Sequence, residues 1–131
     1  MPVSYTFEDR IVVLRAEGRY PAAELRTAAR AAFSDPEGPA AVGLFDGLLI
    51  DARGSLSLRE RSWAELRHTA HMLAPLVNHF GSRIAMVATS DLDYGLLRVA
   101  AVTLEGDGAD AAVFRDVDAA REWLLEDRRH G

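Results

Sequence analysis

An acid, an arginine and two serines follow a strongly apolar run within the stretch LLIDARGSLS, residues 48–57. The apolar run predicts a buried strand, and the carboxyl ends of strands in open α/β sheets border the crevice where ligands bind. Asp51 and Arg53 are therefore a candidate docking point for a ligand or a partner. Asp51 can equally accept backbone N–H bonds or pair with Arg53 or Arg98, and both interpretations stay open.

The two serines of this stretch have different expected roles. Ser57-Leu58-Arg59-Glu60 has the form of a capping box, in which the serine oxygen accepts a backbone N–H bond and the acid returns one. Ser57 is therefore predicted to begin a helix. Ser55 follows a glycine, as serines in turns commonly do, so it is expected to be a polar loop residue. It is also a minor candidate for phosphorylation or partner contact, because phosphate creates or removes docking surfaces.

A second polar group follows a later predicted strand. Ser90 and Asp93 form another serine and acid cap that predicts a helix start. Asp91 lies beside them, at a strand end expected to border the same crevice as the first group. Tyr94 belongs to the apolar face of this helix, so its ring is predicted to be buried with its hydroxyl at the surface. Arg98 is a candidate clamp for an anion or carboxylate, or else forms a surface ion pair.

Motifs for catalysis and metal binding are missing from the sequence. It has no cysteine, no Gly-x-Ser-x-Gly elbow and no Gly-rich phosphate loop between a strand and a helix. His68 and His71 have a spacing that can serve a metal, but the ligand count falls short, and a solvated polar face is the simpler interpretation. We predict no catalytic residues, no metal, no cofactor and no enzymatic activity.

Apolar patterning predicts the strands that position these residues. Alternation at the start of the chain is typical of an edge strand, and a β-branched run after a short polar turn predicts its hairpin partner. Three further apolar segments predict buried strands. The five predicted strands lie within residues 3–7, 11–14, 42–51, 84–88 and 111–114.

Apolar residues at helical spacing predict four helices. They follow Pro21, span residues 58–80, run from Ser90 to Gly106, and follow Asp116 as a cap. In the second helix Trp63 is predicted to face the core together with Leu66, Ala70, Leu73, Val77 and Phe80, and Pro75 is predicted to kink or break it. The order β-β-α-β-α-β-α-β-α predicts an α/β fold with parallel strands joined by helical crossovers.

The composition fits a single soluble domain. Of 131 residues, 49% are hydrophobic and 27% charged, with a net charge of −5. The acidic balance and scattered arginines exclude the basic surface that nucleic acid requires, and no apolar run reaches the roughly 20 residues of a membrane span. The first ten residues lack a secretory signal, which favours the cytoplasm. Residues 126–131 are predicted to form a frayed tail.

Three stretches together resemble a known family. They are LLIDARG (48–54), RIAMVATSDLDYGLLRVA (83–100) and VFRDVDAAREWL (113–124). The strongest parts are Asp93-Tyr94-Gly95 with Arg98, and the closing Glu-Trp-Leu. In these stretches the chain resembles the small bacterial proteins grouped as STAS/SEC14-like, also called SpoIIAA-like. The resemblance implies a STAS-type fold, in which a mixed sheet with an antiparallel first strand is flanked by helices.

The resemblance carries over neither of two activities known among the relatives. In those that antagonise anti-sigma factors, a partner kinase phosphorylates a serine in an Asp-Ser-Ser/Thr-Gly motif at a helix start. The matching stretch here is Asp51-Ala52-Arg53-Gly54, so Ala52 and Arg53 stand where the hydroxyls would be. SEC14-type relatives carry lipids in an apolar cavity, for which 131 residues leave little room.

These observations predict a regulatory or protein-interaction module of STAS-like type, non-catalytic and without the usual phosphorylatable serine motif. The partner surface is predicted near residues 51–57 and 91–98. The alternative is a small-ligand binding protein that holds an apolar or anionic molecule, lipid included. Met72 lies on the otherwise polar side of the second helix, which suggests a homodimer.

Overall fold

A β-hairpin opens the fold. The computed structural model describes residues 2–43, 45–79 and 83–126, and its first two strands are β1 (Val3–Glu8) and β2 (Ile11–Gly18), which pair antiparallel. Asp9 takes a left-handed conformation in the tight turn between them, with φ of 55°, which aspartate tolerates better than most residues. The predicted hairpin is therefore confirmed.

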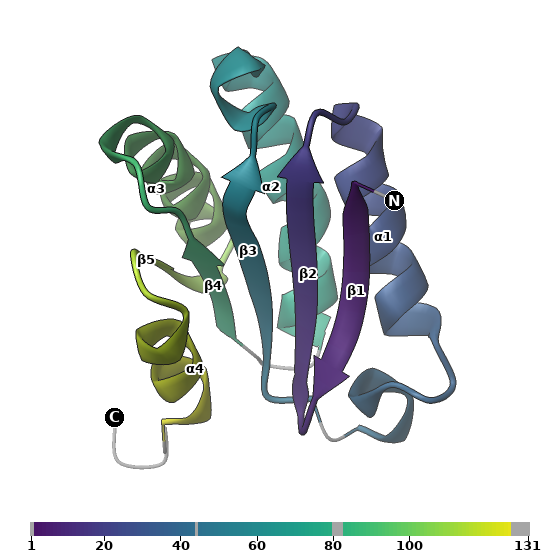
Figure 1. Cartoon of the computed structure of the whole chain (residues 1–131). Coiled ribbons are helices and arrows are strands. Elements are labelled where there is room, and N and C mark those ends of the chain that lie inside the picture. The colour runs from purple at the N-terminus through teal and green to yellow at the C-terminus, as the bar shows by residue number, and fades with distance from the viewer. Residues whose placement is uncertain (1, 44, 80–82, 127–131) are drawn as a thin grey trace.

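Three more strands extend the sheet in chain order, β1-β2-β3-β4-β5, and each pairs parallel to the strand before it. The structure is thus the predicted α/β fold, with a mixed five-stranded sheet and four α-helices (Figure 1). The remaining elements are α1 (Ala22–Ser34), η1 (Pro39–Val42), β3 (Gly47–Ser55), η2 (Leu58–Glu60), α2 (Trp63–His79), β4 (Arg83–Val87), α3 (Asp91–Gly106), β5 (Asp110–Phe114) and α4 (Val117–Leu125).

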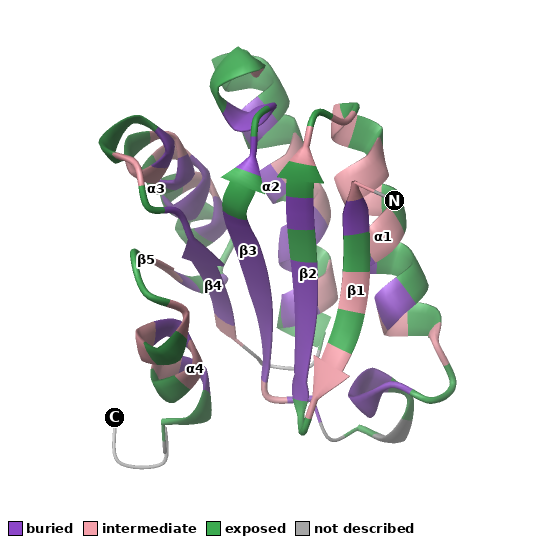
Figure 2. Cartoon of the chain, in the orientation of Figure 1, coloured by how far each residue is buried: buried purple, intermediate pink, exposed green. Residues whose placement is uncertain are grey.

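The helices divide unequally between the two faces of the sheet. Parallel strands added in one direction and joined by crossovers of one hand put the connecting helices on the same face. Accordingly, α1, α2 and α3 pack on one face in a single large core cluster, which includes Leu14, Ile50 and Met86. Of the described helices, α4 alone packs on the other face, where Leu124 meets Leu49 in a smaller cluster. Figure 2 shows the central strands buried over most of their length.

Because α4 is short, it leaves part of its face of the sheet uncovered. Its nine residues span about 13 Å, whereas the nine residues of β3 span about 30 Å. The helix packs against the start of β3, where a Cβ on Gly47 would lie 2.5 Å from Leu124 Cδ2. The far ends of β2 and β3 are exposed on this side, and they carry Arg15, Glu17 and Arg53.

Several sequence predictions differ from the structure. Helix α2 begins only at Trp63, and this side chain is 61% exposed, so its predicted core position is wrong. The helix continues through Pro75 without a break, and β3 extends to Ser55 instead of ending at Asp51. Phe80 and residues 127–131 of the predicted tail lie outside the described residues. In the described segments, each helix is too short or too polar to cross a bilayer.

Candidate functional site

The parallel strands deliver most of the predicted site residues to one edge of the sheet. We call it the carboxyl edge; it consists of the loops after Gly18, Ser55, Val87 and Phe114, where β2 to β5 end (Figure 1). The predicted residues do not form one site there, because consecutive residues of a strand point to opposite faces and a register shift between β2 and β3 after Asp51 turns Ser55 away from the face that carries Asp51. Three separate arrangements result: a charged cluster at Asp51, an ion pair at Asp91, and a hydrogen-bonded group around Ser55.

On the α4 side, Asp51 is the centre of a charged cluster with Arg53 and Arg15. Asp51 is only 4% exposed, and Arg53 binds both of its oxygens, with Nε 2.9 Å from Oδ1 and Nη2 2.9 Å from Oδ2. The backbone N–H of Arg53 donates to Oδ1 as well, at 3.1 Å. Arg15 Nε lies 3.7 Å from Oδ2. The interpretation that Asp51 pairs with Arg53 is therefore confirmed.

The electrostatics of this cluster favour the charged form of the Asp51 carboxylate. Burial by itself raises the pKa of Asp51, but the hydrogen bonds from Arg53 and the positive charges of Arg53 and Arg15 outweigh burial and hold the pKa below its ordinary value. The same bonds raise the pKa of Arg53. A carboxylate with both oxygens occupied is a poor general base, so the cluster is suited to docking more than to proton transfer.

The second predicted group has an arginine of its own that the sequence did not single out. Arg115 Nη2 lies 2.8 Å from Asp91 Oδ1, and its Cζ lies 4.5 Å from the centre of the half-buried Tyr94 ring. Arg115 also donates to the carbonyl oxygen of Thr89. Arg98 is exposed on α3 and forms no ion pair with any described residue. Asp91 and Tyr94 are thus brought together, and Arg98 is not part of their contacts.

On the face of the sheet that α1, α2 and α3 cover, two buried serines at the carboxyl edge form hydrogen bonds with Tyr20. The Ser55 hydroxyl lies 2.9 Å from the Tyr20 hydroxyl, and the backbone N–H of Tyr20 donates to Ser57 Oγ at 2.8 Å. Ser55 and Ser57 are 3% and 2% exposed. In this conformation a kinase cannot reach either hydroxyl. Phosphorylation of Ser55 stays a prediction that would require this edge to open.

The predicted capping box at Ser57 is wrong, because the box lies one turn later. Ser57 makes no side-chain cap bond to η2. Instead Ser62 Oγ accepts from the Glu65 N–H at 3.1 Å, and Glu65 Oε1 accepts from the Ser62 N–H at 2.9 Å. The sequence contains both Ser-x-x-Glu patterns, and the Ser57 oxygen accepts from the backbone N–H of Tyr20 instead of capping η2. The caps predicted at Ser90 and Asp116 are confirmed, although Asp93 turns to Arg59 and does not reach back to Ser90.

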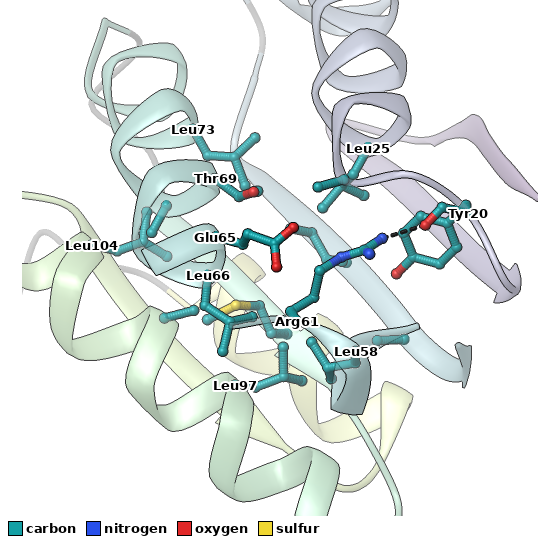
Figure 3. A pocket seen from close by; sticks show the side chains of 16 residues that line it. Tyr20, Leu25, Leu58, Arg61, Glu65, Leu66, Thr69, Leu73, Leu97 and Leu104 are labelled. Carbon is teal, nitrogen blue, oxygen red and sulfur yellow. Dashed lines mark hydrogen bonds between the residues drawn. The ribbon is translucent and has the colours of Figure 1, made fainter. Parts of the chain in front are cut away.

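Beneath this edge lies an apolar cavity of about 60 Å³ between the sheet and helices α1, α2 and α3 (Figure 3). Its floor is Ile50, Ala52 and Met86, from β3 and β4. Ten of its sixteen lining residues are buried. The walls are Tyr20, Ala22, Leu25, Leu58, Arg61, Glu65, Leu66, Thr69, Ala70, Leu73, Leu97, Ala100 and Leu104.

The mouth of the cavity lies between the start of α1 and the start of α2, because the partly exposed lining residues come from there. Arg61 spans it, with Nη2 donating to the carbonyl oxygen of Tyr20 and Cζ 5.2 Å from the centre of the Tyr20 ring. Hydrogen bonds with Ser62, and then the positive charge of Arg61, hold the pKa of Glu65 below its ordinary value. The mouth therefore carries one cation and one anion.

Sequence reasoning missed Tyr20, Arg61 and the cavity. The available signal was the pair Ala70 and Ala100, small residues at core positions of α2 and α3. Because the two helices pack side by side on the same face of the sheet, two alanines leave space that larger side chains would fill. Their alignment depends on how the helices pack, which the linear sequence does not show.

Metal binding and homodimer formation receive no support from the geometry. Across the described ranges, no three histidine, aspartate or glutamate side chains lie close enough to hold a metal; His71 is engaged by Asp107. Met72 is half-buried, and its sulfur accepts a hydrogen bond from Arg30 of α1 at 3.2 Å. The homodimer stays a prediction.

Comparison with protein families, curated proteins and solved structures finds no match to this chain.

Proposed function

We propose that this chain is a non-catalytic binding module of STAS-like type, and that it binds a small ligand whose apolar part enters the cavity beneath the carboxyl edge. The observation that carries the proposal is the cavity itself. Protein interiors are close-packed and have few voids larger than a water molecule. An apolar space of about 60 Å³ exceeds the about 10–15 Å³ that one water needs.

The lining explains why an apolar group suits this space better than water. A buried water needs two to four polar partners, and apolar cavities stay dry and bind apolar molecules. Only Tyr20, Arg61, Glu65 and Thr69 offer polar side chains, and none of them belongs to the buried part of the lining. Ligand pockets commonly combine such an apolar body with a few polar groups at one end. The size favours a small molecule over a lipid.

The test is xenon binding followed by the methyl resonances of Met86 and Leu97. Xenon occupies apolar protein cavities, so both methyl groups are expected to shift with xenon pressure and to saturate. The variant Ala100→Leu fills the cavity and is expected to abolish the shifts. Val102→Leu is the matched control, because Val102 lies on the exposed side of the same helix at 68% exposure. Shifts that persist in Ala100→Leu, or that never occur, would contradict the proposal.

A second candidate function is the regulatory interaction module, with a partner protein at the carboxyl edge. It is favoured by three large apolar side chains exposed there: Leu56 at 50%, Trp63 at 61% and Leu92 at 55%. They belong to the loop after β3 and to the first turns of α2 and α3. Exposed apolar groups gathered at one edge are typical of interaction surfaces.

The partner surface is tested by cross-linking in the native host. Trp63→Ser and Leu92→Ser are expected to lose the partners that the unmodified chain captures. Leu125→Ser is the control, because Leu125 is equally exposed, at 52%, but lies at the end of α4. Identical partners for all three variants would remove this candidate.

A further inference from the structure

We infer that the ligand of the apolar cavity carries a carboxylate, which Arg61 binds at the mouth, so that the ligand class is a short-chain or branched monocarboxylate. The inference rests on the proposed function, because it names the ligand of the same site. Its basis is the distribution of unused hydrogen-bond donors around the mouth of the cavity.

Among the described residues that line the cavity, Arg61 is the only cation, and most of its donor capacity is unused. One nitrogen, Nη2, donates to the Tyr20 carbonyl oxygen; Nε and Nη1 have no acceptor among the described residues. A guanidinium has five N–H donors in a planar fork that matches a carboxylate. Contact with the Tyr20 ring at 5.2 Å orients the fork at the edge of the apolar space.

Glu65 does not neutralise Arg61 directly. The Glu65 carboxylate lies farther than 4.0 Å from the guanidinium, since the two form no ion pair, and its Oε1 is occupied by the Ser62 N–H. This carboxylate is exposed to water, so an amine on a ligand would have to compete there with solvent. The free donors of Arg61 therefore favour an anion over a cation.

The start of α2 adds a favourable field. This helix has 17 residues and begins at Trp63, two positions after Arg61. The positive end of its dipole favours a negative group near its first turn. The cavity beneath it has room for only a few carbon atoms, as its volume of about 60 Å³ indicates. A short alkyl body with one carboxylate fits both the space and the charge.

The test compares three probes that share one branched alkyl body: isovalerate, isovaleramide and isoamylamine. Binding is measured by calorimetry and by the Met86 and Leu97 methyl shifts of the unmodified chain. Isovalerate is expected to bind about tenfold or more tightly than the other two, since its charge adds charge-assisted hydrogen bonds. Equal affinities, or tightest binding of the amine, would overturn the inference.

Two variants assign the preference to Arg61. Arg61→Gln is expected to bring isovalerate to the affinity of the amide, whereas Arg61→Lys, which keeps a cation without the fork, retains part of the preference. Glu65→Gln keeps the capping box and is expected to strengthen isovalerate binding, because it removes a repelling charge. An undiminished preference in Arg61→Gln would overturn the assignment.

The two proposals fail in distinguishable ways. If xenon occupies the cavity while the three probes bind alike, the carboxylate inference is wrong and the proposed function stands. If xenon and all three probes leave the methyl resonances unchanged, the cavity is not a binding site and both are wrong. The probe comparison on the unmodified chain needs no variant, so it decides the inference even if Arg61→Gln does not fold.

Discussion

The hydroxyl oxygens of Tyr20 and Ser55 lie 2.9 Å apart and join segments that are 35 residues apart in the chain. This bond ties the loop between β2 and α1 to the end of β3. The backbone N–H of Tyr20 is held by Ser57 and its carbonyl oxygen by Arg61. Tyr20 thus connects the loop before α1 to Ser55, Ser57 and Arg61, the last of which spans the mouth of the apolar cavity.

Removing the Tyr20 hydroxyl is expected to destabilise the fold. Tyr20→Phe leaves the buried Ser55 hydroxyl without its partner, which lowers the free energy of unfolding by about 1–3 kcal/mol. Urea denaturation measures this change. Tyr94→Phe is the control, since the Tyr94 hydroxyl has no hydrogen bond to any described residue, and its effect should be close to zero. Equal effects of the two substitutions would argue against the structural role of Tyr20.

The Asp51 cluster predicts a dependence of stability on acid. The folded-state pKa of Asp51 lies below its ordinary value of 3.8, so its contribution is complete above that value and is lost as the pH falls through the lower, folded-state pKa. Asp51→Asn is expected to cost about 1 kcal/mol at pH 7, since both arginines are half exposed and partly solvated.

The measurement is the free energy of unfolding of both proteins in urea at pH 7 and pH 3. The difference between the unmodified chain and Asp51→Asn should shrink at the lower pH, because pH 3 lies below the ordinary pKa of 3.8 that Asp51 has in the unfolded chain, where its contribution to stability begins to be lost. A difference that is constant or grows as the pH falls would contradict the assigned direction of the pKa.

The position of the capping box predicts separate effects for two serines. Ser62→Ala removes the cap of α2 and is expected to cost about 1 kcal/mol, with faster hydrogen exchange at the Glu65 amide. Ser57→Ala should instead accelerate exchange at the Tyr20 amide, whose acceptor it removes. Faster exchange at the Glu60 amide in Ser57→Ala, with Tyr20 unchanged, would restore the cap predicted at Ser57.

Two glycine substitutions are expected to have opposite effects. Gly47→Ala puts a Cβ 2.5 Å from Leu124 Cδ2, and such overpacking costs about 1–3 kcal/mol. Gly95→Ala lies within α3 with nothing inside 4 Å of the new Cβ, so it should stabilise the protein by about 0.5–1 kcal/mol. Thermal denaturation compares them. Tolerance of Gly47→Ala would show that α4 does not pack closely on β3.

The sequence predicts the order of strands and helices because the apolar residues of a strand or helix recur with a period set by the face that is buried, and this period is visible within a few residues. It also offers the Asp51 and Arg53 pair, since residues two apart on a strand share a face. The position of Trp63 was mispredicted because the apolar spacing of α2 extends back to it. Trp63 is the first residue of the helix, and its side chain is exposed instead of packing against the sheet.

The cavity and its mouth were beyond sequence reasoning for a different reason. Tyr20, Arg61 and Ala100 come from three elements, and only the packing of these elements brings them around one space. Ser57 carries a valid local pattern, but a contact with Tyr20, 37 residues away, outcompetes it. Local patterns therefore predict the elements well and the site poorly.

The most direct test of the central claim is a crystal structure of the full chain under xenon pressure. We predict a xenon atom in contact with Ile50, Met86 and Leu97, beneath an Arg61 side chain that reaches the Tyr20 carbonyl oxygen. A cavity closed by its own side chains, or one that stays empty while xenon occupies other sites, would contradict the claim that this chain binds a small apolar group there.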